Sequence, residues 1–442
     1  MSSHRVTVRG GTLALPSGLA AGDLQIEDGV ITAVGAVSGD PGEIIDAQHL
    51  LVMPGLIDPQ VHFREPGLTH KEDIGSGSRA AAAGGITAFL EMPNTDPPTT
   101  SRERLDDKKA RARAGSSVDF GFFIGATPDN LEQLLAIDDA GDVPGIKIFM
   151  GSSTGSLLVK DRAALENIFS HGKKLIAVHA EDEDRLVARK AEFAGRTDVA
   201  AHSEMRDAEA ARLATALAIE LSERYQRRLH ILHLSTKDEV ELLRRRGKGA
   251  GRITAEVTPQ HLLFAAPGIY DRLGTKAQMN PPLRSQEHVE ALWAGLRDGT
   301  LDLIATDHAP HTLEEKARGF GKAPSGMPGV ETSLAAMLDA AHRGLCSVAD
   351  VVRWMSAAPA QAYRIQRKGA LAIGNDGDFV LVDLKKTRRI EEGQIQTRVG
   401  WSPFEGLPLT GWPIATYLRG RAVYREGAIE AAVRGAPLEF GS

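Results

Sequence analysis

Polar side chains follow a series of short apolar segments, at the point where each segment ends. In the clearest case, the mainly apolar segment 301–305 runs directly into Thr306, Asp307 and His308. A buried strand that ends on a carboxylate and an imidazole presents both groups at one rim of a sheet, where parallel α/β folds place their chemistry. The same design recurs earlier in the chain, and its polar residues are Gln60, His62, Arg64, Asn94, Lys147, His179 and His233.

Several of these residues are of the types that bind zinc. Imidazole nitrogens and a carboxylate that meet in one concave site form the ligand set of a zinc-type ion. A lone histidine is more often a hydrogen-bonded structural group, and we interpret His4, His49 and His70 in that way. Four ligand-type residues at separate strand ends favour metal binding over a purely structural role. We therefore predict metal ligands at His62, His179, His233 and Asp307.

Lys147 is the odd member of the set, because a protonated amine is unfavourable beside a metal ion. The nine residues from Gly151 to Val159 offer no carboxylate in its place. A buried lysine with a lowered pKa can react with carbon dioxide to give a carbamate, an anionic ligand with two oxygens. Lys147 is therefore a candidate carboxylated lysine, and the alternative is a lysine that pairs with a nearby acid or with a substrate carboxylate.

The elements that carry these residues alternate between strand and helix patterns from residue 51 onward. Apolar segments span residues 56–62, 86–92, 119–124, 145–150, 175–179, 230–234, 253–257 and 301–305. Segments of helical pattern lie between them, at 77–83, 102–114, 130–140, 162–171, 204–225, 237–245 and 287–296. This alternation predicts an α/β fold, a (β/α)8 TIM barrel over residues 55–368, because a doubly wound sheet would leave strands over.

The two ends of the chain have a different pattern. Residues 5–55 read as short strands, with Asp28-Gly29 as a hairpin turn between two of them. After helical patterns at 332–343 and 348–363, strand patterns return at 378–383, 394–399 and 414–423. We therefore predict one small β-sandwich domain built from both termini, residues 1–54 and 369–442.

Composition excludes several classes of function. The 442 residues are 42% hydrophobic and carry a net charge of −6 with acidic and basic residues interspersed, which predicts no nucleic-acid partner. No apolar run is long enough to cross a bilayer, so we expect no membrane partner. The single Cys346 fits a reducing compartment, and the start of the chain lacks the apolar core of a signal peptide. The expectation is a cytoplasmic enzyme or binding protein.

The motifs at the strand ends resemble the amidohydrolase superfamily and, within it, the dihydroorotase family. They are His62-Phe-Arg-Glu-Pro-Gly, Glu91-Met-Pro-Asn-Thr, Lys147-Ile-Phe-Met, Ala177-Val-His-Ala-Glu, Leu232-His-Leu-Ser, Met279-Asn-Pro-Pro-Leu-Arg and Ala305-Thr-Asp-His-Ala-Pro-His, in the family's order. The match covers essentially the whole chain. The resemblance to dihydroorotases in particular rests on Arg64, Asn94, Asn280 and His311.

The resemblance implies reversible closure of N-carbamoyl-L-aspartate to L-dihydroorotate in pyrimidine biosynthesis. The expected partners are this small-molecule substrate and further copies of the same chain, in a homo-oligomer such as a dimer. It implies zinc, whose bound water or hydroxide attacks the ring, and Asp307 as the general base that becomes the general acid. It assigns Arg64 and Asn94 to the substrate's α-carboxylate. It also implies that the pocket is completed by Asn280, His311 and the 323–326 loop with Ser325 and Gly326, although relatives usually have an aromatic residue at position 325.

Gln60 departs from the family pattern. The first strand of relatives usually ends His-x-His, and here it reads Gln60-Val61-His62. Residues two apart on a strand face the same way, so Gln60 presents an amide oxygen where an imidazole is expected, and this is a weaker zinc ligand. We therefore predict one firmly bound zinc and leave the second open. The alternatives are a catalytically silent structural partner, or another cyclic amidohydrolase such as a hydantoinase (dihydropyrimidinase) or an allantoinase.

Overall fold

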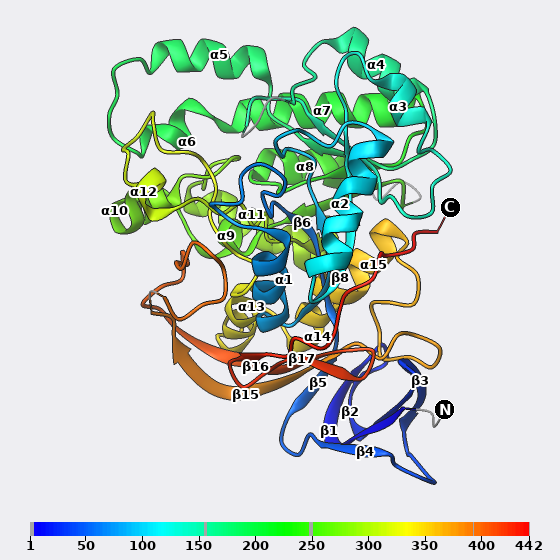
Figure 1. Cartoon of the computed structure of the whole chain (residues 1–442). Helices are drawn as coiled ribbons and strands as arrows, with labels where there is room; N and C mark the ends of the chain where they lie inside the picture. Colours follow the sequence, from blue (N-terminus) through cyan, green and yellow to red (C-terminus); the bar gives the residue numbers. More distant parts are fainter. Residues whose placement is uncertain (1–3, 154–156, 247–250, 392, 442) are drawn as a thin grey trace.

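Parallel strands form a barrel in the centre of the computed structural model, which describes residues 4–153, 157–246, 251–391 and 393–441 (Figure 1). The barrel strands are β6 (Leu56–Val61), β7 (Ile86–Glu91), β8 (Asp119–Phe122), β9 (Ile124–Gly125), β10 (Ile146–Phe149), β11 (Ile176–His179), β12 (Leu229–Ile231), β13 (Ile253–Val257) and β14 (Leu303–Ile304). β8 and β9 are two halves of one strand interrupted at Phe123, whose N–H still donates to the Glu91 carbonyl of β7. The predicted (β/α)8 barrel is therefore confirmed.

The barrel closes between its first strand and the segment after its last. Val61 and His308 form a parallel bridge, and the His62 N–H donates to the His308 carbonyl over 2.8 Å. The Asp58 carboxylate also accepts hydrogen bonds from the Thr306 N–H (3.1 Å) and the Thr306 hydroxyl (2.5 Å). Because all strands run in the same direction, their carboxyl ends meet at one rim.

Helices surround the barrel (Figure 1). They are α1 (Ile74–Ala83), α2 (Arg102–Gly115), α3 (Leu131–Leu135), α4 (Arg162–Ser170), α5 (Glu183–Glu192), α6 (Ala201–Met205), α7 (Ala208–Arg224), α8 (Lys237–Arg246), α9 (Pro259–Leu263), α10 (Gly268–Leu273), α11 (Gln286–Asp298), α12 (Leu313–Lys316), α13 (Ser333–His342), α14 (Val348–Val352) and α15 (Ala358–Tyr363). A 3-10 turn covers Gly274–Ala277 and a π-helical turn covers Arg353–Ala357. In the described part of the chain, no helix combines the length and apolarity that a bilayer span requires.

Two helices differ from the prediction. The expected helix at 204–225 is divided into α6 and α7, because the Asp207 carboxylate accepts the Ala210 N–H (3.1 Å) and starts a new helix there. The expected helix at 130–140 ends after Leu135. The Asp138 carboxylate instead accepts the N–H groups of Lys173 and Lys174, over 2.7 and 3.0 Å, which draws this segment toward the start of β11.

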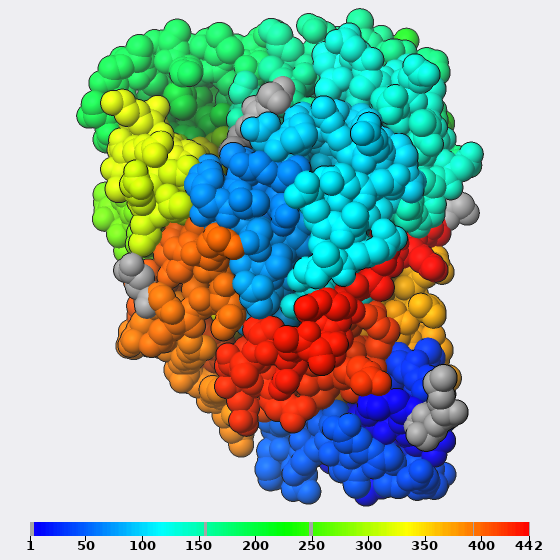
Figure 2. All heavy atoms as spheres, viewed as in Figure 1, coloured from blue at the N-terminus to red at the C-terminus, as the bar shows by residue number. Residues whose placement is uncertain are grey.

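A second sheet combines strands from both ends of the chain. Its strands are β1 (Arg5–Leu15), β2 (Gly18–Glu27), β3 (Val30–Gly35), β4 (Glu43–Asp46), β5 (Leu51–Pro54), β15 (Phe379–Arg389), β16 (Pro408–Leu418), β17 (Arg421–Arg425) and β18 (Ala428–Ile429). Among the described residues these nine strands are one sandwich-like sheet in which β5 pairs with β15. It encloses its own apolar core, where the Phe379 and Tyr417 rings stack 4.4 Å apart. Figure 2 shows the N-terminal strands as a lobe in contact with C-terminal segments.

The hairpin turn predicted at Asp28-Gly29 is present in this sheet. Asp28 and Gly29 have φ of 49° and 85°, as the tight turn between β2 and β3 requires.

The prediction of a strand at 394–399 is wrong. Backbone N–H groups there donate to side-chain carboxylates instead of a neighbouring strand: Gln396 to Glu331 (2.7 Å), and Arg398 to Glu72 (3.2 Å).

A buried lysine joins the barrel to this sheet. Lys368 Nζ contacts the carboxylates of Asp119 (2.6 Å), Asp376 (2.8 Å) and Asp378, and Arg419 also pairs with Asp119 (2.8 Å). The ligand atoms of the three carboxylates lie within 4.8 Å of one another, a spacing that would suit a metal ion, but the cation among them is the Lys368 ammonium. Burial lowers the pKa of Lys368, and the surrounding carboxylates more than reverse this, so its pKa is raised.

Lys368→Met should strongly destabilise the fold, because it leaves buried carboxylates without their counter-charge. We expect a loss of about 3–5 kcal/mol in the free energy of unfolding, measured with urea. Lys160→Met is the control, since Lys160 and Asp184 form a pair that is 47% and 86% exposed. Its effect should stay within about 0.5 kcal/mol. A similar loss in both variants would contradict a central role for the buried cluster.

Candidate active site

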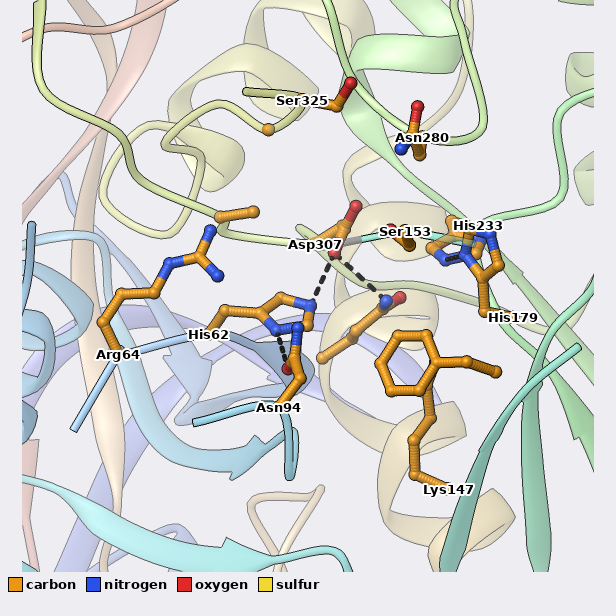
Figure 3. A pocket seen from close by; sticks show the side chains of 14 residues that line it. His62, Arg64, Asn94, Lys147, Ser153, His179, His233, Asn280, Asp307 and Ser325 are labelled. Atoms are coloured by element: carbon orange, nitrogen blue, oxygen red, sulfur yellow. Dashed lines mark hydrogen bonds and ion pairs between the residues drawn. The ribbon is translucent and has the colours of Figure 1, made fainter. Parts of the chain in front are cut away.

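A cavity opens at the carboxyl ends of the barrel strands (Figure 3). Its walls are formed by Gln60, His62, Arg64, Asn94, Lys147, Phe149, Ser153, His179, His233, Asn280, Asp307, Ala309, Ser325 and Gly326. Every site residue expected from the sequence lines it except His311, which lies behind Arg64. Residues separated by more than 240 positions in the chain are therefore in contact, for example Gln60 and Asp307.

Asp307 receives hydrogen bonds from the first strand. Gln60 Nε2 and His62 Nε2 each lie 3.1 Å from Asp307 Oδ1, and His62 Nδ1 lies 2.7 Å from Asn94 Oδ1. A carboxylate oxygen can only accept, so the amide nitrogen of Gln60 must face Asp307 and its oxygen must face elsewhere. Burial lowers the pKa of His62, although the hydrogen bond to Asp307 and the charge of Asp307 oppose this.

His179 and His233 meet on the other side of the cavity. His179 Nδ1 lies 3.1 Å from His233 Nε2, and His179 Nε2 lies 2.9 Å from Glu181. Burial raises the pKa of Glu181, but Arg206 outweighs it and holds the carboxyl ionised. Nε2 therefore carries the proton of the neutral His179 ring, and the Nδ1 lone pair accepts a hydrogen bond from His233 Nε2. A carboxylate that orients an imidazole in this way is typical of metal sites.

Lys147 contributes an amine without a partner. Its side chain is fully buried, and Nζ has no hydrogen-bond partner within the described residues. Nζ lies 4.4 Å from the centre of the Phe149 ring. Burial lowers the pKa of Lys147 to about 7, although the charges of Asp307 and Glu256 oppose this. A neutral amine is therefore well populated at physiological pH.

The donor set fits a bound metal ion. His233 Nδ1, Gln60 Oε1 and Lys147 Nζ are buried and lack partners in the parts of the chain that are described. Buried polar atoms are nearly always satisfied in native proteins, and unpaired ones that surround a cavity indicate a group that binds there. His179 and His233 both line the cavity with their rings in contact, so nitrogen ligands of the type that zinc prefers lie together at its wall.

Arg64 forms a second, cationic region of the cavity. Its Nε donates to the Pro310 carbonyl (3.3 Å) and its Nη2 lies 3.2 Å from His311 Nε2. Among the described residues no carboxylate pairs with this guanidinium, which is only 1% exposed. Burial lowers the pKa of Arg64 to about 10, so it remains charged. The charges of Asp307, Glu91, Glu315 and Glu72 favour the charged form from a distance. A buried guanidinium that no carboxylate contacts directly is still costly and fits a site that awaits an anion.

His311 is held in one tautomer behind Arg64. Its Nδ1 lies 3.1 Å from Lys71 Nζ, which can only donate, and its Nε2 lies 3.1 Å from the Ser325 carbonyl, which can only accept. Burial, assisted by the Arg64 charge, lowers the pKa of His311 to about 3. The ring is therefore neutral with its proton on Nε2. Lys71 also pairs with Glu315 over 3.0 Å.

Three lining residues have backbone conformations that are rare outside glycine. The φ angles of Arg64, His233 and Asp307 are 64°, 36° and 47°. Such values cost energy and concentrate at functional sites, where the surrounding structure compensates for them. Each lies just beyond the end of a barrel strand, so the turn directs its side chain into the cavity.

Other residues of the site were not singled out from the sequence. His202 Nε2 lies 3.1 Å from the Asn280 amide oxygen, and burial lowers the pKa of His202 to about 4. Phe149 and Ser153 line the cavity, and Lys71 and Lys316 support its wall. The signal for Phe149 was its position two residues after Lys147, on the same face of β10. His202, Lys71 and Lys316 lie outside the strand ends, and their roles depend on contacts between distant segments.

Comparison with known proteins gives matches over nearly the whole chain. A model of the amidohydrolase family matches residues 51–423. A dihydroorotase of Halobacterium salinarum is 40% identical over 425 residues, covering 92% of this chain and 94% of the relative. A dihydroorotase of Methanosarcina acetivorans is 39% identical, with 92% and 90% covered.

Related activities occur among the matches. An allantoinase of Streptomyces avermitilis is 35% identical and covers 97% of each chain. The solved structure of an L-hydantoinase (dihydropyrimidinase) from Arthrobacter aurescens superposes with a TM-score of 0.93 at 31% identity, covering 98% of this chain and 99% of the other. The fold, the extent of the family match and these identities together establish that the chain belongs to the amidohydrolase family.

Proposed function

We propose that this protein is a dihydroorotase that interconverts N-carbamoyl-L-aspartate and L-dihydroorotate. Relatives bearing that name are 35–40% identical over about nine-tenths of both chains. The observation that carries the proposal is the buried Arg64 guanidinium without a carboxylate partner among the described residues. Dihydroorotate carries a carboxylate on its ring, whereas allantoin and simple hydantoins do not. The allantoinase and hydantoinase likenesses therefore support the cyclic-amide chemistry, and Arg64 supports the choice of an anionic substrate.

We infer that Lys147, His179 and His233 hold one zinc ion, and that His62, Asp307 and Gln60 offer a weaker second site. When bound, zinc supplies Lewis acidity, which lowers the pKa of a water and polarises a carbonyl. Carboxylation suits Lys147: the neutral amine forms an N–C bond with carbon dioxide and loses a proton. The resulting anion would satisfy an amine that has no partner within the described residues.

Asp307 is the group that we assign to proton transfer. In hydrolysis it takes a proton from the attacking water and gives it to the ring nitrogen as the C–N bond breaks. In cyclisation, the carbamoyl nitrogen attacks the side-chain carboxylate carbon, and Asp307 takes the nitrogen's proton. With a second proton from solvent, the carboxylate oxygen leaves as water. The hydrogen bonds from Gln60 and His62 hold one oxygen of Asp307 in place.

The remaining residues orient the substrate. Arg64 offers a planar pair of donors that matches a carboxylate in two-point geometry. The neutral His311 presents Nε2–H beside it, and the amides of Asn94 and Asn280 face the same cavity. The Ser325 and Gly326 backbone covers it. Because Asp307, Lys147, His179 and His233 are all present, we favour an active enzyme over a silent homologue. Homo-oligomerisation and a cytoplasmic location remain predictions.

Arg64→Met should lower kcat/KM selectively for the anionic substrate. Losing a charged hydrogen bond typically costs about 1.5–3 kcal/mol, so we expect a loss of about 10- to 100-fold for dihydroorotate. The methyl ester of dihydroorotate keeps the ring but lacks the charge, and its kcat/KM should change by less than about threefold. Equal losses on both compounds would assign Arg64 a structural role.

Asp307→Asn keeps the size of the side chain but removes the proton acceptor. We expect kcat for dihydroorotate hydrolysis to fall by about 10²–10⁴-fold. Zinc content and the urea unfolding midpoint should be measured on the same sample to show that the variant is folded and loaded. Activity within about tenfold of the parent would rule out the proposed proton transfer.

The zinc content of the purified protein should reflect the presence of Gln60. We expect about one chelator-resistant zinc per chain, because loss of even an outer contact can reduce metal affinity about 10- to 100-fold. Gln60→His should raise the content toward two. Labelled carbon dioxide should also give a carbamate signal that is lost in Lys147→Met. Two firmly held zinc ions in the parent, or an unmodified Lys147 amine in the zinc-loaded protein, would contradict this assignment.

A further inference from the structure

A short loop forms the outer wall of the cavity beside Arg64. It consists of Ala323, Pro324, Ser325 and Gly326, of which the last two line the cavity. It has no regular secondary structure, so its position depends on specific contacts. A side chain at Gly326 would not fit, because φ is 137° and a Cβ would lie 2.5 Å from the Ala309 carbonyl oxygen. The loop is therefore pressed closely against the segment that follows Asp307.

Lys316 holds this loop from behind. Its Nζ donates to the carbonyl groups of Pro324 (2.9 Å), Gly326 (2.9 Å) and Gln278 (3.0 Å). An ammonium group has three N–H donors, and each of them is used on a carbonyl. Lys316 is 1% exposed, and within the described residues it pairs with no carboxylate. A buried ammonium held only by carbonyls is costly, so its retention calls for a role.

Gln278 fixes the same loop from the neighbouring segment. Its Nε2 donates to the Ala323 carbonyl (2.9 Å) and to the Ser325 hydroxyl (3.0 Å). Its backbone carbonyl accepts both the Gly326 N–H (2.9 Å) and the Lys316 ammonium. Lys316 and Gln278 together therefore contact every residue of the loop.

These contacts set the geometry of the carboxylate-binding region. In a trans peptide the C=O and the following N–H point in opposite directions. Because the Pro324 carbonyl turns toward Lys316 and the Gly326 N–H turns toward the Gln278 carbonyl, the peptide planes on both sides of Ser325 are fixed. The Ser325 carbonyl then accepts from His311 Nε2 (3.1 Å), and the same nitrogen lies 3.2 Å from Arg64. Hydrogen bonds thus link Lys316 through the loop to the His311 ring, and that ring lies against the guanidinium.

The charges near Lys316 favour an anionic ligand. Burial lowers the pKa of Lys316 to about 7, with Glu315 opposing this effect and Arg64 adding to it. Arg64 and Lys316 are thus two buried cationic groups within electrostatic reach of each other, and within the described residues neither has a carboxylate in an ion pair. An anion bound at Arg64 would relieve their repulsion and favour the protonated, loop-holding form of Lys316.

We propose that Lys316, assisted by Gln278, is a positioning residue that holds the 323–326 loop over the carboxylate end of the bound substrate and so determines its affinity. This inference deepens the proposed function and rests on it, since it takes the anion received at Arg64 to be the dihydroorotate carboxylate. It makes the loop a preformed wall of the site, and Lys316 acts without touching the reacting atoms.

The test compares Lys316→Met with Lys322→Met in the full-length, zinc-loaded protein. Methionine keeps the length of the side chain but removes its charge and donors. Lys322 is exposed and lies directly before the loop, so its replacement removes a nearby charge without removing the buried bonds. For Lys316→Met we expect KM for dihydroorotate to rise at least about tenfold while kcat and zinc content change less than about threefold. Lys322→Met should match the parent.

The outcomes separate the role of Lys316 from the proposed function. A zinc-loaded parent that does not act on dihydroorotate refutes the proposed function. If the parent is active and Lys316→Met leaves KM unchanged, the role of Lys316 is refuted. It is also refuted if kcat and zinc content fall as KM rises, because that would indicate general disruption of the site. If Lys316→Met does not fold, Gln278→Leu removes the bonds on the other side of the loop. It should raise KM at least about threefold with kcat retained, and an unchanged KM would overturn the proposal.

Discussion

The seam between the first and last strands of the barrel is the contact on which the site depends. The His62 N–H binds the His308 carbonyl (2.8 Å), and Thr306 donates two hydrogen bonds to the buried Asp58 carboxylate. These bonds fix the register of two segments that are far apart in the sequence. Asp307 lies between Thr306 and His308, and its left-handed φ of 47° turns its side chain toward the donors of Gln60 and His62. Without this seam, the proposed acid–base group and the proposed metal ligands would not share a cavity.

Within the described residues, buried basic side chains are in direct contact with carboxylates at one end of the barrel and lack such contacts at the other. Where the barrel meets the β-sheet domain, Lys368 is surrounded by Asp119, Asp376 and Asp378, which neutralise it and bind the two parts together. At the carboxyl-terminal rim, Lys147 and Arg64 are buried without such partners among the described residues. A charge that is already paired contributes structure, whereas an unpaired one can bind an incoming group. This contrast separates the acidic cluster, with its metal-like spacing, from the site where a metal and an anionic substrate fit.

Much of the barrel and of its rim could be predicted from the sequence. Short apolar segments that end on polar residues follow from the physics of a buried parallel strand, so Lys147, His179 and His233 could be located before their contacts were known. The strand expected at 394–399 failed because distant carboxylates, Glu331 and Glu72, take up its backbone N–H groups. His202, Lys71 and Lys316 carry no local signal, since each acquires its role only from segments that the fold brings to it. Gln60 was recognised as a departure, but its donor bond to Asp307 required the structure.

The central claim is that this rim binds a cyclic amide through its carboxylate. The most direct measurement is the kcat/KM of the unmodified, zinc-loaded protein for dihydroorotate, allantoin and hydantoin under the same conditions. A site built around a buried guanidinium should reject ligands that leave it unpaired, so we predict a preference for dihydroorotate of at least about 100-fold over both ureides. Equal or faster turnover of allantoin or hydantoin would contradict the account, because Arg64 would then not determine which substrate the site accepts.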